Sequence, residues 1–449
     1  MFERRENEDK LSRKIYIETY GCQMNLNDTE IVSGILLDSG GYEMTDSPDN
    51  ADIIFLNTCS VRENAEKTIF KRINNLRQYI RKDGKKLIGI LGCMAERLQD
   101  KLVSDESMVS LVIGPDEYRK APYLIERALE GQKGIAVELS TVETYEDVIP
   151  VRNDGISAWV SIMRGCNNFC SYCVVPYTRG RERSRSAETI LSEISELKNK
   201  NIKEITLLGQ NVNSYNDEES TFDFPGLLSE CALAAPGIRF RFTTSHPKDM
   251  SDKLIEVMAE HDNICNHIHL PVQSGSDKIL KAMNRRYTVE HYLERIVKIR
   301  EYLPDASLTT DIIAGYPGES DEDHRATLDI LRGVRYDGAF MFKYSPREGT
   351  KAYKLDDNVP DEIKTTRLNE IINLQHEISD TLNKAEQGKI HEVLVEGPSK
   401  RNKDEWMGRT KTNKVVIFPN ENLVYSEGDV VTCKITRHTS ATLFGEIAG

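Results

Sequence analysis

The sequence predicts an α/β protein of three domains: an N-terminal parallel α/β sheet domain, a central partial (β/α)6 barrel and a small antiparallel C-terminal β-barrel. Short apolar strands alternate with helices from residue 14 to residue 335, which is the order typical of parallel sheets. From residue 389 onward apolar and polar residues alternate instead, which indicates half-buried antiparallel strands. We place the domains at residues 14–131, 154–384 and 385–449.

Composition and charge restrict the class of protein. The chain of 449 residues carries a net charge of −13, which argues against a non-specific grip on nucleic acid. Its first 14 residues are densely charged, and no apolar run approaches the roughly 18 residues that a membrane span requires. Nine cysteines without a secretion signal favour metal or redox use over disulfides. We therefore expect a cytoplasmic protein without a membrane segment.

The N-terminal domain is predicted from three short apolar strands, each followed by a helix. Asn27 or Asp28 is expected to cap the first helix, because their side chains accept hydrogen bonds from free backbone amides. The strands are expected at residues 15–20, 52–57 and 86–91, and the helices at residues 28–39, 63–81 and 94–102.

A cysteine follows each of these three strands: Cys22, Cys59 and Cys93. The carboxyl ends of parallel strands meet at one edge of a sheet, so the three thiols are expected to lie together. The adjacent helix N-termini would favour the thiolate form and an anionic cluster. The alternative is that these are single buried cysteines at strand ends. We interpret them as the ligands of a metal–sulfur centre.

A second set of cysteines lies in one loop, where Cys166, Cys170 and Cys173 form a C-x3-C-x2-C pattern. A cubane iron–sulfur cluster is normally held by four thiolates, so three leave one iron open to a small molecule. Zinc is the competing interpretation, but structural zinc sites usually pair two C-x2-C half-sites or add histidines. Three buried free cysteines fit poorly with the polar, turn-prone surroundings.

The central domain repeats strand and helix, and its ligand site is expected at the carboxyl ends of the strands. Polar residues at those ends either converge on a ligand or cap loops and helices. Strands are expected at residues 158–163, 204–208, 239–244, 267–271, 308–315 and 339–344, and helices at 187–200, 249–261, 276–283, 289–302 and 321–335. The candidate ligand-binding residues are Gly209, Gln210, Asn211, Ser245, His246, Gln273 and Asp311.

Several other features have less specific interpretations. Four arginines crowd into residues 179–185, which either form a solvated loop or contact phosphate, and we favour phosphate. Cys231, Cys265 and Cys433 have no partner at ligand spacing and are expected to be buried. His267 and His269 alternate on a strand, so we expect them to pack or form hydrogen bonds.

The last part of the chain is predicted as a long helix over residues 361–387 that docks a small β-barrel. Strands at residues 392–396, 414–418, 429–435 and 442–446, separated by Gly, Pro and Asn turns, indicate the barrel. Such a barrel binds RNA or serves only for dimerisation or capping. The candidate stacking and phosphate contacts are Trp406, Arg409, Lys411, Asn413 and Lys414.

Residues 163–173 (MRGCNNFCSYC) resemble the cluster loop of radical S-adenosylmethionine (radical SAM) enzymes. Residues 19–25 (TYGCQMN), 57–66 (NTCSVRENAE) and 91–97 (LGCMAER) look like the N-terminal domain of the methylthiotransferases. They look most like the branch that acts on isopentenylated adenosine of transfer RNA. The C-terminal barrel resembles the TRAM domain, and the resemblance extends from residue 14 to residue 445.

The resemblance implies two [4Fe-4S] clusters and S-adenosyl-L-methionine as cofactors. It implies that Tyr172 lies against the adenine of that cofactor, although packing is an equal explanation, and that the residues at the strand ends bind the cofactor too. The segment Gly209–Asn211 departs from the Gly-Gly-Glu triplet common in radical enzymes. The implied reaction adds a methylthio group to C2 of an adenine in transfer RNA. The implied partners are tRNA, an electron donor such as a flavodoxin or ferredoxin, and a sulfur-delivery or cluster-assembly protein.

Two alternatives remain open at this point. A sibling enzyme would modify threonylcarbamoyladenosine or an aspartate of a ribosomal protein instead. A protein of a different class would carry clusters and bind RNA or sense redox state without turnover, and would produce no 5′-deoxyadenosine from S-adenosylmethionine.

Overall fold

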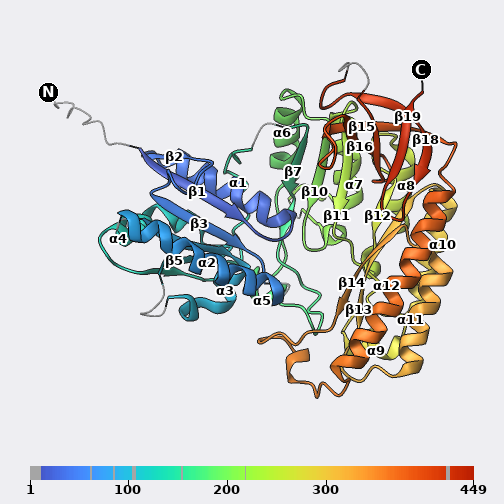
Figure 1. Cartoon of the computed structure of the whole chain (residues 1–449), viewed down its shortest axis with the longest axis horizontal. Helices are drawn as coiled ribbons and strands as arrows, with labels where there is room; N and C mark the ends of the chain where they lie inside the picture. The colour runs from blue at the N-terminus through green and yellow to red at the C-terminus, as the bar shows by residue number, and fades with distance from the viewer. Residues whose placement is uncertain are drawn as a thin grey trace. The chain divides into compact units, whose positions relative to one another are not determined.

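The computed structural model describes residues 12–60, 63–83, 86–103, 108–152, 155–217, 219–420 and 425–448. The predicted domain boundary near residue 154 and most of the charged N-terminal segment lie outside these residues. The chain divides into two compact units, of which the first comprises residues 1–153 with 164–167 and 174–183 (Figure 1). The second unit comprises residues 154–163, 168–173 and 184–449.

The first unit is built on one six-stranded sheet in the order β2-β1-β3-β4-β5-β6, in which every pair of neighbours is parallel. The predicted parallel sheet is confirmed, and β2, β5 and β6 extend it beyond the three predicted strands. The strands are β1 (Arg13–Thr19), β2 (Tyr42–Met44), β3 (Ile53–Thr58), β4 (Leu87–Gly92), β5 (Val109–Ile113) and β6 (Gly134–Ala136).

Helices cover both faces of this sheet because successive side chains of each strand point to opposite faces. Phe55 and Leu91 pack with α1 (Gln23–Asp38) and α4 (Ala121–Leu129), whereas Ile54 and Ile90 pack with α2 (Glu63–Asp83) and α3 (Cys93–Leu98). Short 3₁₀ helices η1 and η2 occupy Gln99–Leu102 and Tyr118–Lys120.

Helix α1 begins five residues earlier than predicted, and Cys22 is its N-cap. The prediction that Asn27 or Asp28 caps the helix is therefore wrong. Both residues lie inside α1 and are buried, with exposed fractions of 1% and 0%. The buried carboxylate of Asp28 is tolerated there because it has partners far away in the sequence, such as Arg164.

The second unit contains the six predicted central strands, all parallel, in two hydrogen-bonded groups ordered β11-β10-β7 and β12-β13-β14. A parallel bridge between Phe240 and Ile264 joins the two groups. The strands are β7 (Ser157–Ser161), β10 (Glu204–Leu208), β11 (Arg239–Thr243), β12 (His267–His269), β13 (Ser307–Ala314) and β14 (Gly338–Lys343). The two-residue strands β8 (Met163–Arg164) and β9 (Arg183–Ser184) each have one residue in either unit.

Helices follow the central strands as the (β/α) order requires, and α7 is one that the sequence did not reveal. Its first turn reads Phe-Pro-Gly, which looks like a loop, but Asp223 caps it by accepting a hydrogen bond from the Gly226 amide. The helices of this unit are α6 (Ala187–Lys198), α7 (Phe224–Ala234), α8 (Asp252–Glu260), α9 (Asp277–Ala282), α10 (Val289–Tyr302) and α11 (Asp321–Val334), with 3₁₀ helices η3 (Val212–Ser214), η4 (Pro247–Asp249) and η5 (Ala352–Lys354). The short helix α5 (Val175–Thr178), which was also not predicted, belongs to the first unit.

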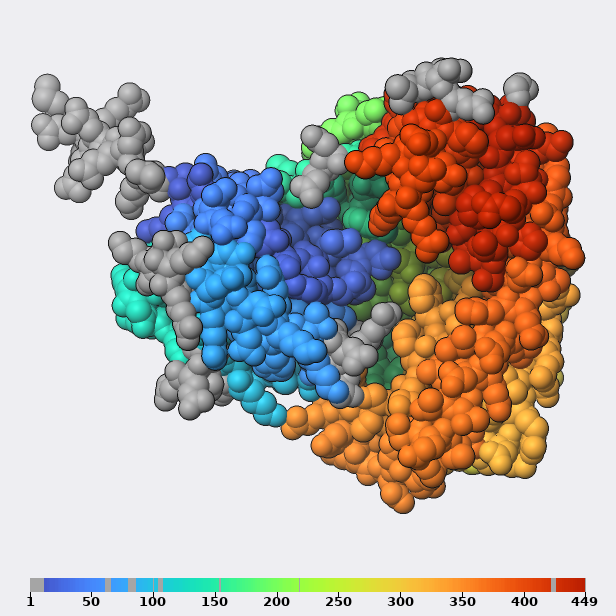
Figure 2. All heavy atoms as spheres, viewed as in Figure 1, coloured from blue at the N-terminus to red at the C-terminus, as the bar shows by residue number. Residues whose placement is uncertain are grey.

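The long helix α12 (Asp361–Lys384) leads into a small closed barrel, as predicted, which has five strands and one parallel pair, β17 with β19. Figure 2 shows the barrel in red beside the orange surface of α12, and Asn383 of α12 donates a 2.9 Å hydrogen bond to the Thr439 carbonyl. The barrel strands close in the order β15-β16-β17-β19-β18. They are β15 (Ile390–Pro398), β16 (Glu405–Thr410), β17 (Val415–Pro419), β18 (Val430–His438) and β19 (Leu443–Ile447), of which β16 was not predicted.

The turn between β16 and β17 docks on the amino ends of the central strands. Arg241 donates to the carbonyls of Thr410 and Lys411 at 2.8 and 3.0 Å. Lys414 pairs with Asp337 at 2.7 Å. The turn therefore fixes the barrel to the central domain within the second unit.

This arrangement corrects two predicted RNA contacts. Trp406 lies in the apolar core of the barrel with 8% of its surface exposed, and Lys414 is held in the docking contact. Arg409 pairs with Glu396 at 2.8 Å. None of the helices in the described residues has the length and apolar character needed to cross a membrane.

Candidate metal–sulfur and ligand sites

The three cysteines of the first unit lie at the carboxyl ends of the adjacent strands β1, β3 and β4, as predicted. Cys59 follows β3 directly, Cys93 begins α3, and Cys22 caps α1. A hydrogen bond with the Cys59 thiol, assisted by the positive charge of Arg179, lowers the pKa of the Cys22 thiol to about 6. Burial raises the pKa of Cys93, and Arg179 opposes that effect. The first unit thus gathers three thiols whose ionisation depends on one another.

Two glycines allow the strand ends to approach so closely. A Cβ on Gly21 would lie 2.6 Å from the Cys59 Cβ, and one on Gly92 would lie 2.6 Å from the Asn57 Oδ1. Both glycines have positive φ angles, +135° and +88°, which favour glycine. Asn25 then ties the ends together, because its Nδ2 donates to the Asn57 Oδ1 at 3.1 Å. The glycines and Asn25 at the strand ends therefore allow the three cysteines to lie close together.

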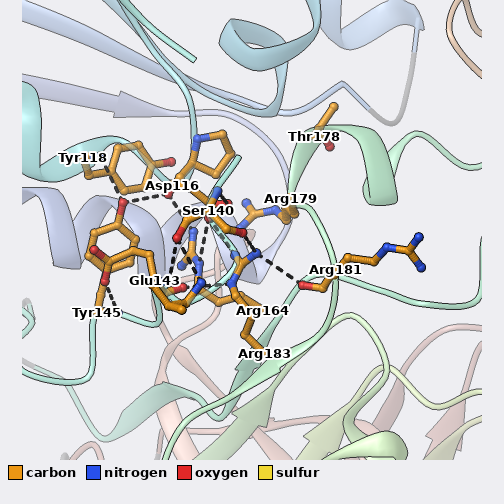
Figure 3. Close-up of polar contacts among 12 residues, drawn as sticks. Asp116, Tyr118, Ser140, Glu143, Tyr145, Arg164, Thr178, Arg179, Arg181 and Arg183 are labelled. Atoms are coloured by element: carbon orange, nitrogen blue, oxygen red, sulfur yellow. Dashed lines mark hydrogen bonds and ion pairs between the residues drawn. The ribbon is translucent and has the colours of Figure 1, made fainter. Parts of the chain in front are cut away.

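The first unit contains a group of buried arginines, and Figure 3 shows Arg164, Arg179 and Arg183 near Asp116. Arg179 donates from Nε to the Cys93 Sγ at 3.2 Å and from Nη2 to the Asp28 Oδ2 at 2.6 Å. Arg164, which is fully buried, donates from Nη1 to the other oxygen of Asp28 at 3.0 Å. Arg183 pairs with Asp116 at 2.8 Å.

The predicted phosphate contact of the arginine-rich loop is therefore wrong for three of its four arginines. Arg179, Arg183 and Arg185 have exposed fractions of 3%, 6% and 7%, and each pairs with a carboxylate. Arg181 alone is exposed. The charge run could not reveal this because the partner of Arg179 is Asp28, 151 residues away.

The loop with the other three cysteines is held by backbone contacts at several points. Cys166 is 9% exposed, and its amide donates to the Gly180 carbonyl at 3.1 Å within the first unit. In the second unit, the amide of Ser171 donates to the Met283 carbonyl at 2.9 Å. Cys170 is 8% exposed and Cys173 is half-buried. The loop conformation thus depends on several fixed backbone contacts.

An arginine that sequence reasoning did not find also donates to one of these thiols. Arg285 is 5% exposed and donates from Nη1 to the Cys170 Sγ at 3.3 Å. Its Nη2 donates to the Pro271 carbonyl at 2.9 Å, which fixes the guanidinium. Each set of cysteines therefore has one buried arginine that donates to a sulfur. Arg285 lies outside every motif found in the sequence, so no local signal could have identified it.

The carboxyl ends of β10 and β11 carry buried polar atoms that have no hydrogen-bond partner in the described part of the chain. They belong to side chains predicted to bind a ligand, and a buried polar atom without a partner costs about 1–3 kcal/mol. A polar ligand at these strand ends would remove that cost. The unpaired atoms are Nε2 and Oε1 of Gln210, Oδ1 of Asn211, Oγ of Ser245 and Nε2 of His246.

The other predicted ligand-binding residues have mixed positions. A Cβ on Gly209 would lie 2.6 Å from the Met163 Cγ, so this position has no room for a side chain. Gln273 has a left-handed φ of +69°, and its amide donates to the Asp311 carbonyl at 2.8 Å. The Asp311 carboxylate lies 3.6 Å from His269. Tyr172 packs against an apolar cluster, so packing accounts for at least part of its role.

The remaining cysteines are buried, as predicted. Cys231, Cys265 and Cys433 are 0–1% exposed, and burial raises their thiol pKa values to about 12, 11 and 12. Within the described ranges, no three Cys, His, Asp or Glu side chains already stand in position to hold a metal ion. The two cysteine sets nevertheless fit iron–sulfur clusters by their chemistry, since each offers three thiols and a buried arginine donor.

Three family models match the chain in the order of its domains. Residues 14–114 match Uncharacterized protein family UPF0004, residues 160–331 match the Radical SAM superfamily, and residues 384–448 match the TRAM domain. A tRNA-2-methylthio-N(6)-dimethylallyladenosine synthase of Chloroherpeton thalassium is 53% identical over 96% of this chain and 95% of its own length. A synthase of the same description from Bacteroides fragilis is 54% identical over 97% of this chain and 96% of its own length.

Solved structures show likeness in fold alone. The radical S-adenosylmethionine methyltransferase TsrM from Kitasatospora setae aligns with a TM-score of 0.55 at 14% identity, over 74% of this chain and 75% of its own. The cobalamin-dependent S-adenosylmethionine radical enzyme OxsB aligns with a TM-score of 0.54 at 13% identity, over 82% of this chain and 56% of its own.

Proposed function

Because this chain belongs to the family of tRNA-2-methylthio-N(6)-dimethylallyladenosine synthases, which are radical SAM tRNA methylthiotransferases, we propose that it adds a methylthio group to C2 of N6-dimethylallyladenosine at position 37 of tRNA. Its cofactors are [4Fe-4S] clusters and S-adenosyl-L-methionine. The observation that carries the proposal is the presence of two separate three-thiol sets, one at the strand ends of the first unit and one in a single loop.

The two cysteine sets are assigned to two clusters. Cys166, Cys170 and Cys173 would hold the cluster that acts with S-adenosylmethionine, and Cys22, Cys59 and Cys93 would hold an auxiliary cluster that carries sulfur. Bound cofactors of this type supply a radical route to an aromatic C–H bond that has neither a leaving group nor useful acidity.

The chain's own residues would orient these groups. Arg285 and Arg179 each donate one hydrogen bond to a cluster ligand, which fixes that sulfur and delocalises its charge. Gln210, Asn211, Ser245 and His246 offer both donors and acceptors to the polar groups of S-adenosylmethionine. Their burial excludes water, which protects a reactive radical from side reactions.

The substrate of the proposed reaction is tRNA, as the relatives' description and the TRAM barrel support. We assign tRNA binding to that barrel, but not to Trp406 or Lys414, which are used inside the molecule. Reaching an adenine within the anticodon loop requires unstacking it, at about a few kcal/mol. A flavodoxin or ferredoxin as electron donor, a sulfur-delivery or cluster-assembly protein, and a cytoplasmic location complete the proposal.

The test is an anaerobic incubation of the reconstituted protein with sulfide, reductant, S-adenosylmethionine and isopentenylated tRNA, followed by nucleoside mass analysis. We expect a methylthio gain on isopentenyladenosine and none on tRNA from cells lacking the isopentenyl transferase. Formation of 5′-deoxyadenosine without the gain would indicate the substrate of a sibling enzyme. Neither product, with both clusters intact, would indicate a binding or sensing protein.

A further inference from the structure

Arg179 has one nitrogen whose role the contacts within the protein do not explain. Its side chain is 97% buried, and Nε and Nη2 are committed to the Cys93 sulfur and to Asp28. The third nitrogen, Nη1, is buried and has no hydrogen-bond partner among the described residues. Leaving a charged donor unpaired in the interior is costly, so an acceptor is expected at this position.

The charges around Arg179 indicate that this acceptor is an anion. Among the residues that the structure describes, the carboxylates that pair with Arg164, Arg179 and Arg183 are Asp28 and Asp116, so three positive charges meet two carboxylates. Nearby Glu96 adds little negative charge near neutral pH, because burial and the neighbouring Asp116 raise its pKa to about 8. Arg179 brings this positive charge to the cysteines, since its Nε lies 3.2 Å from the Cys93 Sγ.

We propose that Arg179 is a positioning residue that holds a small anionic sulfur species, such as hydrosulfide, against the Cys22–Cys59–Cys93 centre. This inference rests on the proposed function, in which that centre carries the sulfur to be transferred. Nη1 donates to the added sulfur while Nε donates to Cys93, so one rigid guanidinium sets the position of both. Asp28 fixes the orientation of the guanidinium through Nη2.

Sulfide binding can be measured on the auxiliary centre alone. Full-length protein with Cys166, Cys170 and Cys173 changed to Ala would be reconstituted and reduced, and its paramagnetic resonance spectrum followed as sodium sulfide is added. In this background, Arg179→Lys keeps the positive charge beside Asp28 but loses the planar guanidinium with its several N–H donors. Arg183→Lys is the matched control, because Arg183 is an equally buried ion-paired arginine for which no sulfur contact is found.

We expect Arg179→Lys to retain iron and to bind sulfide at least about tenfold more weakly, while Arg183→Lys stays within about twofold of the parent. Unchanged sulfide binding in an iron-loaded Arg179→Lys protein would overturn the proposal and leave the proposed function standing. Failure of Arg179→Lys alone to take up iron would also overturn it, since Arg179 would then serve cluster assembly. A parent protein without any iron would instead refute the auxiliary cluster itself.

A second measurement avoids substitution of Arg179. Arginine labelled with ¹⁵N would be incorporated into the parent protein, and nuclear couplings to the reduced auxiliary cluster recorded with and without sulfide. We expect one ¹⁵N coupling before sulfide, from the nitrogen that donates to Cys93, and a second one after it. An unchanged spectrum while sulfide binds would contradict the proposal.

Discussion

Replacing Asp28 with Asn should destabilise the first unit strongly. The carboxylate is fully buried and accepts from Arg164 at 3.0 Å and from Arg179 at 2.6 Å. Although burial opposes its ionisation, the charges of Arg179 and Arg164 lower the pKa of Asp28, so it is a carboxylate at neutral pH. The substitution keeps the shape but leaves two guanidinium groups without their shared counter-charge.

The expected loss follows from the energetics of buried ion pairs. Removing one partner of such a pair costs about 3–5 kcal/mol, because the remaining charge stays buried and uncompensated. Each 1.4 kcal/mol is roughly a factor of ten in an equilibrium constant, so the opening equilibrium of the first unit should rise by about 150-fold or more.

Amide hydrogen exchange of β1, β3 and β4 is the appropriate assay, because the chain has more than one unit and a single unfolding free energy is not defined for it. The matched control is Asp147→Asn. The Asp147 carboxylate also pairs with an arginine, Arg119, but the Asp147 side chain is 67% exposed, so its loss should change exchange by about fivefold or less. Exchange in these strands that rises less than about threefold in Asp28→Asn would refute the reasoning.

Three further perturbations have defined outcomes. Gly92→Ala should lower the iron content of the auxiliary centre, because its Cβ would lie 2.6 Å from an oxygen of Asn57. Gly131→Ala is the control and should keep the iron content, because Gly131 has a similar φ of +87° but no atom within 4 Å of the added Cβ. Equal iron contents in the two variants would contradict this prediction. A hydrogen bond from His391 lowers the pKa of Glu386 to about 2, so the stabilisation is present above pH ~4.3 and lost as pH falls toward 2. Lowering the pH toward 2 should therefore accelerate the hydrogen exchange of β15, corrected for intrinsic rates, in the parent protein. The acceleration should be smaller in Glu386→Gln. Arg241→Ala should expose the β16–β17 turn to protease, and an unchanged cleavage pattern would show that other contacts suffice.

Local periodicity was sufficient to predict most elements. Strand β10 and helix α10 begin and end at the predicted residues, because each has a clear apolar pattern with a defined boundary. For α10 that boundary is Thr288, whose hydroxyl accepts from the His291 amide at 3.2 Å. The same reasoning correctly brought the cysteines after β1, β3 and β4 to one edge of the sheet.

Prediction from the sequence failed at polar residues whose hydrogen-bond partners are distant in the chain. Asn25 and Asp28 look like residues of a solvated helix start, but their partners are Asn57, Arg164 and Arg179, which are 32 to 151 residues away. An arginine that pairs with a remote buried carboxylate has the same local sequence as one that contacts phosphate. Tertiary hydrogen bonds of this kind leave no periodic signal, so the arginine donors to the cluster sulfurs could be found only in the structure.

The central claim is that two separate three-cysteine sets hold two clusters, and iron analysis of two triple variants tests it most directly. One variant carries Ala at Cys22, Cys59 and Cys93, and the other carries Ala at Cys166, Cys170 and Cys173. Each reconstituted variant is expected to hold about four irons, half of the native content, with a distinct resonance spectrum. Loss of all iron from either variant would contradict the account, because the two sets would then form one centre.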